Sequence, residues 1–353
     1  MGILQSIYDE TFKEKIESLS IEQIEKIDEG VMSDIMLGII DETSKVLDAT
    51  LMDTIDEHIN KEDMYSKEFC ERLKEQWGEA FKLSKALSVI SLESVEAFFE
   101  ENNEVRFDEE AKIYNLQRLH ARACRMSDEI LCLLKAGYPD AGLARWRSLY
   151  EVAVISTFLA ENDNELSERY LDYAVLESYK EMLLYNQYSN SLNANKFTKD
   201  EIGELKNKRD ELLAKYGKEY KEQYGWAARI LTSKYERNFK GIEQFVSLDH
   251  LRPYYKWACN KAHAGSKGND NHLGLMNGHN YILVGPSNYG FADVGHCTAI
   301  ALNIVTVNVL TYRPTIDTLV VAKIMTYFTD RISNTYLNIQ RAIEGNVDED
   351  CHN

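Results

Sequence analysis

The sequence predicts an all-α fold, a multi-helix bundle with long antiparallel helices. Apolar residues recur every three or four positions along most of the chain, which is the spacing of an amphipathic helix. Only four of the 353 residues are proline and most glycines come late, so long helices can run without interruption. One region departs from this pattern, because NYILVG and YGFADV could pair as one small β-hairpin near 280–295.

The first hundred residues are expected to form several short-to-medium amphipathic helices. Ser20 and Gln23 have the spacing of a capping box, in which two side chains satisfy the free amide donors at a helix start. A longer helix over 68–101 is predicted from its apolar residues, which recur every three or four positions. They are Leu73, Trp77, Ala80, Leu83 and Leu87.

Two long helices are predicted next, over 107–136 and 141–161. Gly137 can end the first of them, and Pro139 prevents its continuation. Because a short link joins them, the two helices should form an antiparallel hairpin.

The second half of the chain supplies the other helices of the predicted bundle. Thr198 and Glu201 form a second capping box at the start of a helix that is charged on nearly all sides. Such a helix is typical of an exposed arm or of a face that binds a partner. The remaining helices are expected at 163–191, 198–216, 250–264, 295–312 and 315–343.

Acidic residues are concentrated at the N-terminal end. The formal charge is −18, and residues 1–100 contribute −14 of it, with 10 Lys and Arg against 24 Asp and Glu. We expect an acidic N-terminal helical region at 1–70, a main helical domain at 71–345 and a tail at 346–353. An acidic surface repels phosphate backbones and favours a basic protein partner. The N-terminal region is therefore a candidate for binding another protein.

Cysteine usage and hydropathy favour a cytoplasmic protein with no membrane span. The six cysteines include no Cys-x-x-Cys pair and the sequence shows no signal peptide, so reduced thiols are expected. The most apolar run, CTAIALNIVTVNVL at 297–310, is shorter than the roughly 20 residues that a membrane span needs. We expect it to form a buried helix.

An arginine and a glutamate on the helix over 141–161 are the first functional candidates. Arg147 and Glu151 are four residues apart, so they share one helix face and can pair. As a structural ion pair they would orient two helices. Alternatively, Glu151 would hold Arg147 so that its guanidinium fork can meet a phosphate. Arg145 lies roughly 200° round the helix, on a different face.

A basic stripe on the helix over 107–136 is the second candidate. Arg118, Arg122 and Arg125 lie at positions i, i+4 and i+7 and therefore share one face. An exposed stripe of this kind could bind RNA or an acidic domain. It could also neutralise the acidic N-terminal region of the same chain.

The segment YYKWACNKAHAGSKG at 254–268 is the third candidate. His263 could act as a general acid or base, since imidazole titrates near neutrality, with Lys256 as a nearby cation and Asn260 as a hydrogen-bond donor. It could equally cap the free carbonyls at a helix end. Cys259 lies one turn before His263, but the spacing typical of zinc ligands is missing, and no metal is expected.

The motifs of the common nucleotide cofactors are missing from the sequence. It contains no Gly-x-x-x-x-Gly-Lys loop, no serine nucleophile elbow and no Rossmann fingerprint. We therefore expect no cofactor.

Two stretches carry a recognisable pattern, LLKAGYPDAGLARWRSLYEVAVISTFLAENDNELSERYLDYAVLESYK and YYKWACNKAHAGS. The pattern is a helix hairpin, an Arg-x-x-x-Glu, an Arg-Tyr pair, and a late helix that ends in a polar residue and a histidine. These positions are Arg147, Glu151, Arg169, Tyr170, Asn260 and His263. Over about 105–310 the chain resembles a family of helical bacterial proteins catalogued as domain of unknown function 5677. The resemblance implies an all-α domain and assigns no activity.

A weaker likeness is to HEPN-like helical ribonucleases and toxins of bacterial antiviral defence systems. Their pattern is an arginine, a polar residue and a following histidine, assembled across a dimer. Here Lys256 stands seven residues before His263 in place of that arginine. This likeness implies a homo-oligomer and a metal-independent hydrolase that acts on RNA.

Two functions from different classes follow from these features. In the first, a defence- or toxin-like protein acts on RNA or a nucleotide through a pocket of Arg147, Glu151, Asn260 and His263. His263 would move a proton, Arg147 would hold phosphate charge, and Glu151 would orient Arg147. In the second, a non-catalytic sensor or scaffold binds a partner protein through its acidic N-terminal helices, and Arg147 and Glu151 are purely structural.

Overall fold

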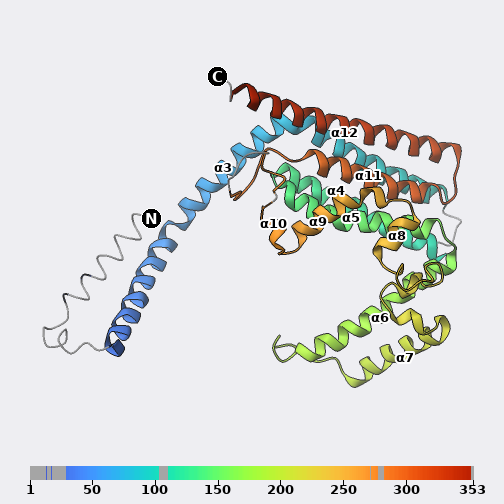
Figure 1. Cartoon of the computed structure of the whole chain (residues 1–353), viewed down its shortest axis with the longest axis horizontal. Coiled ribbons are helices and arrows are strands. Elements are labelled where there is room, and N and C mark those ends of the chain that lie inside the picture. Colours follow the sequence, from blue (N-terminus) through green and yellow to red (C-terminus); the bar gives the residue numbers. More distant parts are fainter. Residues whose placement is uncertain are drawn as a thin grey trace. The chain divides into compact units, whose positions relative to one another are not determined.

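The structure is a computed structural model, and it describes Lys13, Glu17 and the ranges 29–102, 110–270, 272–276 and 282–350. The chain divides into two compact units, Met1–Arg72 and Leu73–Asn353, which are described separately. Within the described ranges all regular structure is helical and no strand is present, as the fold class predicts (Figure 1).

The helix α3 (Glu29–Glu101) is continuous over 73 residues. The prediction of several shorter helices is therefore wrong from Glu29 onward, and the Ser20–Gln23 capping box lies outside the described residues. No proline interrupts this stretch. Hydroxyl groups that could cap separate helices bond back along α3 instead, and Thr50 Oγ1 donates to the carbonyl of Val46 at 2.9 Å.

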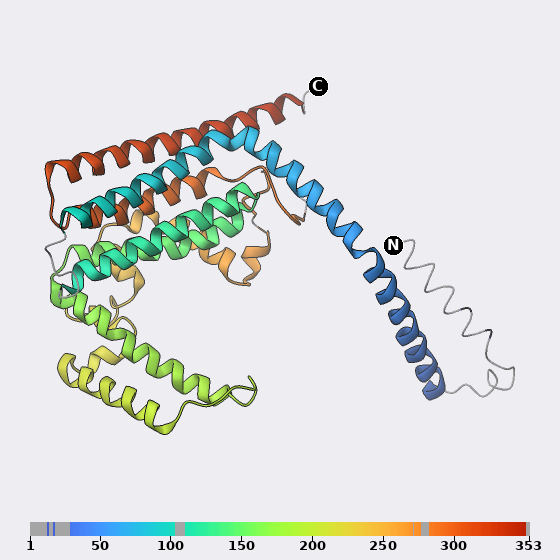
Figure 2. The same ribbon diagram turned by 180° about the vertical axis from the view of Figure 1, so that it is seen from behind.

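Four long helices form the body of the second unit: α4 (Ala111–Lys135), α5 (Pro139–Ala160), α11 (Ala292–Leu310) and α12 (Ile316–Asp350). They lie side by side in both views (Figures 1 and 2). α4 and α5 form the predicted antiparallel hairpin. The part of α3 beyond Leu73 joins the same core, in which one apolar cluster connects α3, α4 and α11. Its members are Val95, Phe98, Ile113, Leu116, Val309 and Leu310.

α11 is the buried helix that the apolar run at 297–310 predicts. By length and composition it is also the one helix among the described residues that could cross a membrane. However, 61% of its apolar window is buried inside the protein. Its hydropathy is therefore explained by its central place between α5, α4 and α12.

The predicted β-hairpin near 280–295 is not formed by the described residues. Residues 282–291 are a loop and α11 begins at Ala292, while 277–281 lie outside the described ranges. A helix replaces the second strand because the residues from Ala292 onward bury an apolar face in the bundle. The loop turns at Gly290, whose φ is +86° and where a Cβ would lie 2.1 Å from the carbonyl oxygen of Leu273.

The remaining elements pack beside this body and complete the sites described below. α6 and α7 form a second hairpin, and α7 begins with the predicted capping box between Thr198 and Glu201. α7 has no buried residue, as its charge pattern predicts. The bounds are α6 (Asn164–Tyr188), α7 (Lys199–Tyr216), α8 (Phe239–Phe245), α9 (Arg252–Ala262) and α10 (Ser266–Asp270).

Candidate functional site

Arg147 and Glu151 on α5 meet α9 through a single tyrosine. Arg147 Nη2 lies 2.9 Å from Glu151 Oε1, so the two side chains form an ion pair. Tyr255 on α9 donates its hydroxyl to the same Glu151 oxygen at 2.8 Å, and Arg147 Nη2 donates to the Tyr255 hydroxyl at 3.3 Å. These three polar groups therefore form one closed network between α5 and α9.

The network keeps the phenol of Tyr255 protonated. Burial, and next the bond to Glu151, raises the pKa of Tyr255, so its phenol stays protonated and can donate. Arg147 Nε also donates to Cys259 Sγ at 3.3 Å. Two of the five guanidinium N–H groups thus face α9, and the arginine fork is oriented by protein contacts on both helices.

Glu151 also lines a cavity of about 450 Å³, which we call the tyrosine pocket. This volume lies within the range of small-molecule sites. α4, α5, α6, α8 and the loop before α8 supply its walls. The residues important here are Arg122, Glu151, Tyr170, Tyr224, Trp226 and Phe239. One pocket thus combines a cation, two carboxylates (Glu151 and Glu177) and five aromatic side chains, with Tyr173 as the fifth.

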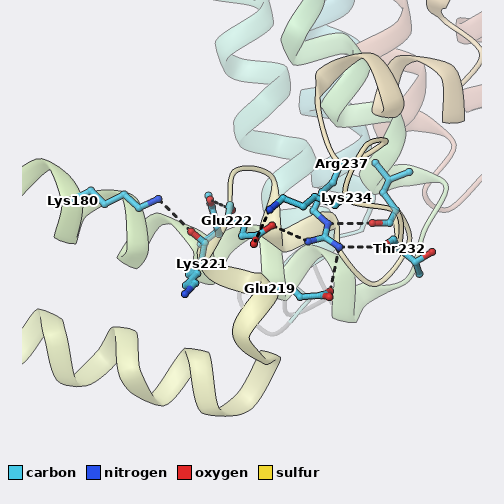
Figure 3. Close-up of polar contacts among 9 residues, drawn as sticks. Lys180, Glu219, Lys221, Glu222, Thr232, Lys234 and Arg237 are labelled. Atoms are coloured by element: carbon cyan, nitrogen blue, oxygen red, sulfur yellow. Dashed lines mark hydrogen bonds and ion pairs between the residues drawn. The ribbon is translucent and has the colours of Figure 1, made fainter.

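Arg237 fixes the loop that carries Tyr224 and Trp226, and Figure 3 shows its contacts with Glu219, Glu222 and Thr232. The Arg237 side chain is only 3% exposed, and its Nη2 donates to Glu219 and to the carbonyl of Thr232, both at 3.2 Å. Its Nη1 lies 3.6 Å from Glu222. A buried guanidinium with paired carboxylates costs much free energy to disrupt, so the loop is held rigidly beside the pocket.

The Arg169–Tyr170 pair on α6 also contacts this loop. Arg169 is buried, and its Nε donates to the carbonyl of Trp226 at 3.3 Å. The Tyr170 ring meets the Trp226 ring edge-on, with their centroids 4.9 Å apart. The two residues therefore position the aromatic wall of the tyrosine pocket.

Tyr224 has an uncommon backbone conformation. Its φ of +57° places it in the left-handed region, which costs a non-glycine residue roughly 1–2 kcal/mol. A glycine adopts this conformation without the cost. The glycine of this turn is the next residue, Gly225, yet the left-handed residue is Tyr224. The position carries a tyrosine side chain into the pocket lining despite the backbone strain, which is a feature found often at functional sites.

The cation and the carboxylates that line the tyrosine pocket do not form ion pairs with one another. Arg122 is exposed, and among the described residues it forms no ion pair. Burial, and then the neighbouring Glu181, raises the pKa of Glu177 at the pocket wall. Burial also raises the pKa of Tyr170, against the opposing effect of Arg122. Arg122 is therefore available for a negatively charged group.

The other predicted residues do not all gather at this pocket. Arg125 pairs with Glu129 at 3.0 Å, and Arg118 lies over the Tyr114 ring, 4.5 Å from its centroid. Arg145 also bonds to Glu129, on a different face from Arg147 as predicted. Asn260 lines a second cavity, described below.

Lys256 and His263 are both exposed and line neither cavity. His263 is the C-cap residue of α9, and its backbone N–H bonds to the Cys259 carbonyl. Within the part of the chain that the structure describes, no three His, Cys, Asp or Glu residues lie where they could hold a metal ion. His279 lies outside that part.

Sequence reasoning did not identify five aromatic residues of the site: Tyr173, Tyr224, Trp226, Phe239 and Tyr255. Tyr255 lies inside the conspicuous segment 254–268, but only geometry pairs it with Glu151. The sequence YGW at 224–226 gives a local signal, since a glycine between two aromatic residues marks a tight turn. That signal does not show which helix the rings face.

The fold and the pocket define an all-α helical protein with a preformed aromatic cavity at one side of its central hairpin. Residues 114–280, slightly less than half of the chain, match the model of a family described as "Family of unknown function (DUF5677)". The resemblance to that family is thereby confirmed, and the matched segment runs from α4 to the loop before α11 and includes the whole α5–α9 network. No curated protein matches the chain, and no solved structure matches it.

Proposed function

We propose that the tyrosine pocket binds a nucleotide, either free or at the end of an RNA chain. The observation that carries the proposal is the presence of Arg122 and Glu151 in one cavity with Tyr170, Tyr224 and Trp226. Aromatic side chains stack on the faces of bases, and arginine pairs with phosphate. A carboxylate accepts hydrogen bonds from the amino groups of a base.

The size and charge of the protein favour a short ligand over a long nucleic acid. A cavity of about 450 Å³ has room for one nucleotide. The net charge of −18 opposes the approach of an extended polyanion. Arg118 and Arg125 engage a ring and a carboxylate of their own helix, which leaves Arg122 as the phosphate ligand of this proposal.

In the test, AMP, GMP, CMP and UMP are titrated into the full chain, and calorimetry measures the affinity of each. Tyr224→Ala should weaken binding about tenfold or more, because a stacked base contributes about 1–3 kcal/mol. Arg122→Gln should weaken the binding of nucleotides and leave the binding of nucleosides, which lack the phosphate, unchanged. Tyr235→Ala and Arg331→Gln are matched controls, since Tyr235 is 94% exposed and Arg331 lies on α12 outside the pocket. Equal affinity in all five proteins would contradict the proposal, and so would no binding by the unaltered chain.

The catalytic extension of this proposal is a HEPN-like ribonuclease or nucleotide-processing activity in a cytoplasmic defence- or toxin-like protein. His263 would transfer a proton while Arg147 holds phosphate charge, and Asn260 and Lys256 would assist. None of these four residues lines the tyrosine pocket, so the reacting phosphate would lie outside it. His263→Ala should abolish hydrolysis of labelled RNA or nucleotide with an unchanged melting temperature, because the side chain is exposed. An active His263→Ala protein would end the catalytic extension but not the binding proposal.

A second candidate function is the binding of a partner protein, or of a second copy, by the first unit. Its support is a row of exposed apolar side chains on the N-terminal part of α3, spaced 3, 11 and 4 residues apart and therefore on one face. They are Leu37, Ile40, Leu51 and Ile55. Replacing Leu51 and Ile55 by serine in the full chain should abolish partner binding or self-association, measured by sedimentation, and leave nucleotide binding unchanged.

A further inference from the structure

A second cavity, of about 350 Å³, shares no lining residue with the tyrosine pocket. We call it the α9 pocket, because Trp257, Asn260 and Lys261 of α9 form one wall. The loop at 272–275, the turn at Gly290 and the first turn of α11 form the others. Its volume is also that of a small-molecule site.

A buried cation with unused donors lies in this wall. The Lys261 side chain is only 9% exposed, and its Nζ is 2.9 Å from Asp140 Oδ1. That contact lacks hydrogen-bond geometry, and Lys261 Nζ has no hydrogen-bond partner among the described residues. Asp140 Oδ1 already accepts the backbone N–H of Leu273 at 3.0 Å. An ammonium has three donors, so Lys261 keeps donors beyond its pairing with Asp140. Its Nζ has almost no exposed surface and must turn toward the cavity to donate to a ligand there.

A half-buried carboxylate lies in the wall formed by α11. Asp293 lines the cavity, and no described residue donates a hydrogen bond to it. Burial raises the pKa of Asp293, and His296 opposes this effect only partly. Buried charged groups without hydrogen bonds are costly, and a cationic donor in the cavity would relieve this cost.

Apolar surface completes the cavity. Leu143 and Leu275 line it, together with Trp257, which is 48% exposed. One small space is thus lined by a lysine that pairs with Asp140, by a carboxylate to which no described residue donates, and by apolar side chains. A ligand that satisfies all three has a carboxylate, an ammonium and an apolar side chain.

We propose that the α9 pocket binds a free α-amino acid with an apolar side chain. Lys261 and the Asn260 amide donate to its carboxylate, Asp293 accepts from its ammonium, and Trp257 and Leu143 contact its side chain. A zwitterionic amino acid carries no net charge, so its binding leaves the ion pair between Lys261 and Asp140 intact. The site is separate from the tyrosine pocket, so either proposal can fail while the other stands.

The test compares three ligands on the full chain by calorimetry and thermal shift: L-leucine, leucinol, which lacks the carboxylate, and 4-methylpentanoate, which lacks the amine. Leucine should bind at least about tenfold more tightly than either analogue, because each analogue leaves one charged wall unpaired. Equal binding of the three compounds, or no binding of leucine, would overturn the proposal.

Variants then locate the site. Asp293→Asn keeps the shape of the side chain. It should weaken the binding of leucine about tenfold and leave the binding of 4-methylpentanoate, which lacks the amine, unchanged. Lys261→Met should weaken the binding of leucine and of 4-methylpentanoate, which both carry the carboxylate, and leave that of leucinol unchanged. A melting curve shows whether this variant folds. Asp317→Asn, in the exposed first turn of α12, and Lys199→Met, at the exposed start of α7, are the controls. Unchanged leucine affinity in Asp293→Asn would overturn the assignment.

Discussion

His120 Nε2 lies 3.0 Å from Ser91 Oγ in the interior of the bundle. Both side chains are almost fully buried, and Ser91 Oγ also contacts Thr306 Oγ1 at 2.7 Å. The three residues belong to α3, α4 and α11, so one polar chain crosses the apolar core. Such a chain is tolerated only because its members satisfy one another.

This arrangement predicts that the fold loses stability in mild acid. Burial lowers the pKa of His120 to about 4 from its ordinary 6.5, so the folded protein keeps the imidazole neutral. The stabilising contribution is fully present above pH 6.5 and is lost as the pH falls from there toward 4. Between pH 8 and pH 4.5 the loss should be about 2.5 kcal/mol, measured by urea unfolding.

His120→Gln keeps a polar side chain and removes the titration, so its stability should fall less over the same pH interval. His250→Gln is the control, because that histidine is exposed. If His120→Gln and the unaltered protein lost the same free energy of unfolding, the acid sensitivity would have another origin.

The bond from Tyr255 to Glu151 predicts a coupled pair of variants. Tyr255→Phe should cost about 1 kcal/mol, the value of a typical hydrogen bond. Glu151→Ala completes a double-mutant cycle. The sum of the two single-variant losses in free energy of unfolding should exceed the loss in the double variant by at least about 0.5 kcal/mol, which is the coupling energy. Tyr150→Phe removes a bond to the Leu248 carbonyl and should be additive with Glu151→Ala. Additivity in both cycles would mean that Tyr255 and Glu151 are not energetically coupled.

The helices were largely predictable because their causes are local. Apolar spacing placed α4 and α5 within a few residues of their bounds, and a continuous apolar run did the same for α11. The Thr198–Glu201 box marked the start of α7. The sequence did not predict α3 as a single helix. Polar residues that often cap helices also occur inside a long helix when no proline or turn interrupts it. The β-strand expected before α11 failed because burial in the bundle outweighs local preference.

The site was predictable only where its residues share one helix. Arg147 and Glu151 are four apart on α5, and their pairing follows from that spacing. The partner that completes the network, Tyr255, lies 104 residues later. Asn260 and Glu151 were expected in one pocket but line different cavities, because their positions depend on how α9 packs against α5.

Close packing of α11 against α12 predicts that Gly295→Ala is destabilising. A Cβ at Gly295 would lie 2.4 Å from the ring of Tyr336, which is fully buried and cannot move outward. Overpacking of this kind costs typically 1–3 kcal/mol. Gly345→Ala on α12 is the control, because its Cβ would meet nothing within 4 Å and the better helix propensity of alanine should be neutral or stabilising. Thermal unfolding of both variants measures the difference, and a Gly295→Ala protein as stable as the unaltered chain would contradict the close approach.

The role of Arg237 gives a prediction that connects stability with the tyrosine pocket. Its guanidinium reaches Glu219, Glu222 and two backbone carbonyls, which a lysine ammonium cannot do because it lacks the planar fork. Arg237→Lys should therefore cost about 2 kcal/mol through unsatisfied buried groups and should weaken nucleotide binding, since the loop that carries Tyr224 and Trp226 loosens. Arg229→Lys is the matched control, because Arg229 forms exposed pairs that contribute at most about 1 kcal/mol. If Arg237→Lys lowered the melting temperature but left nucleotide affinity unchanged, the loop would be a structural element only.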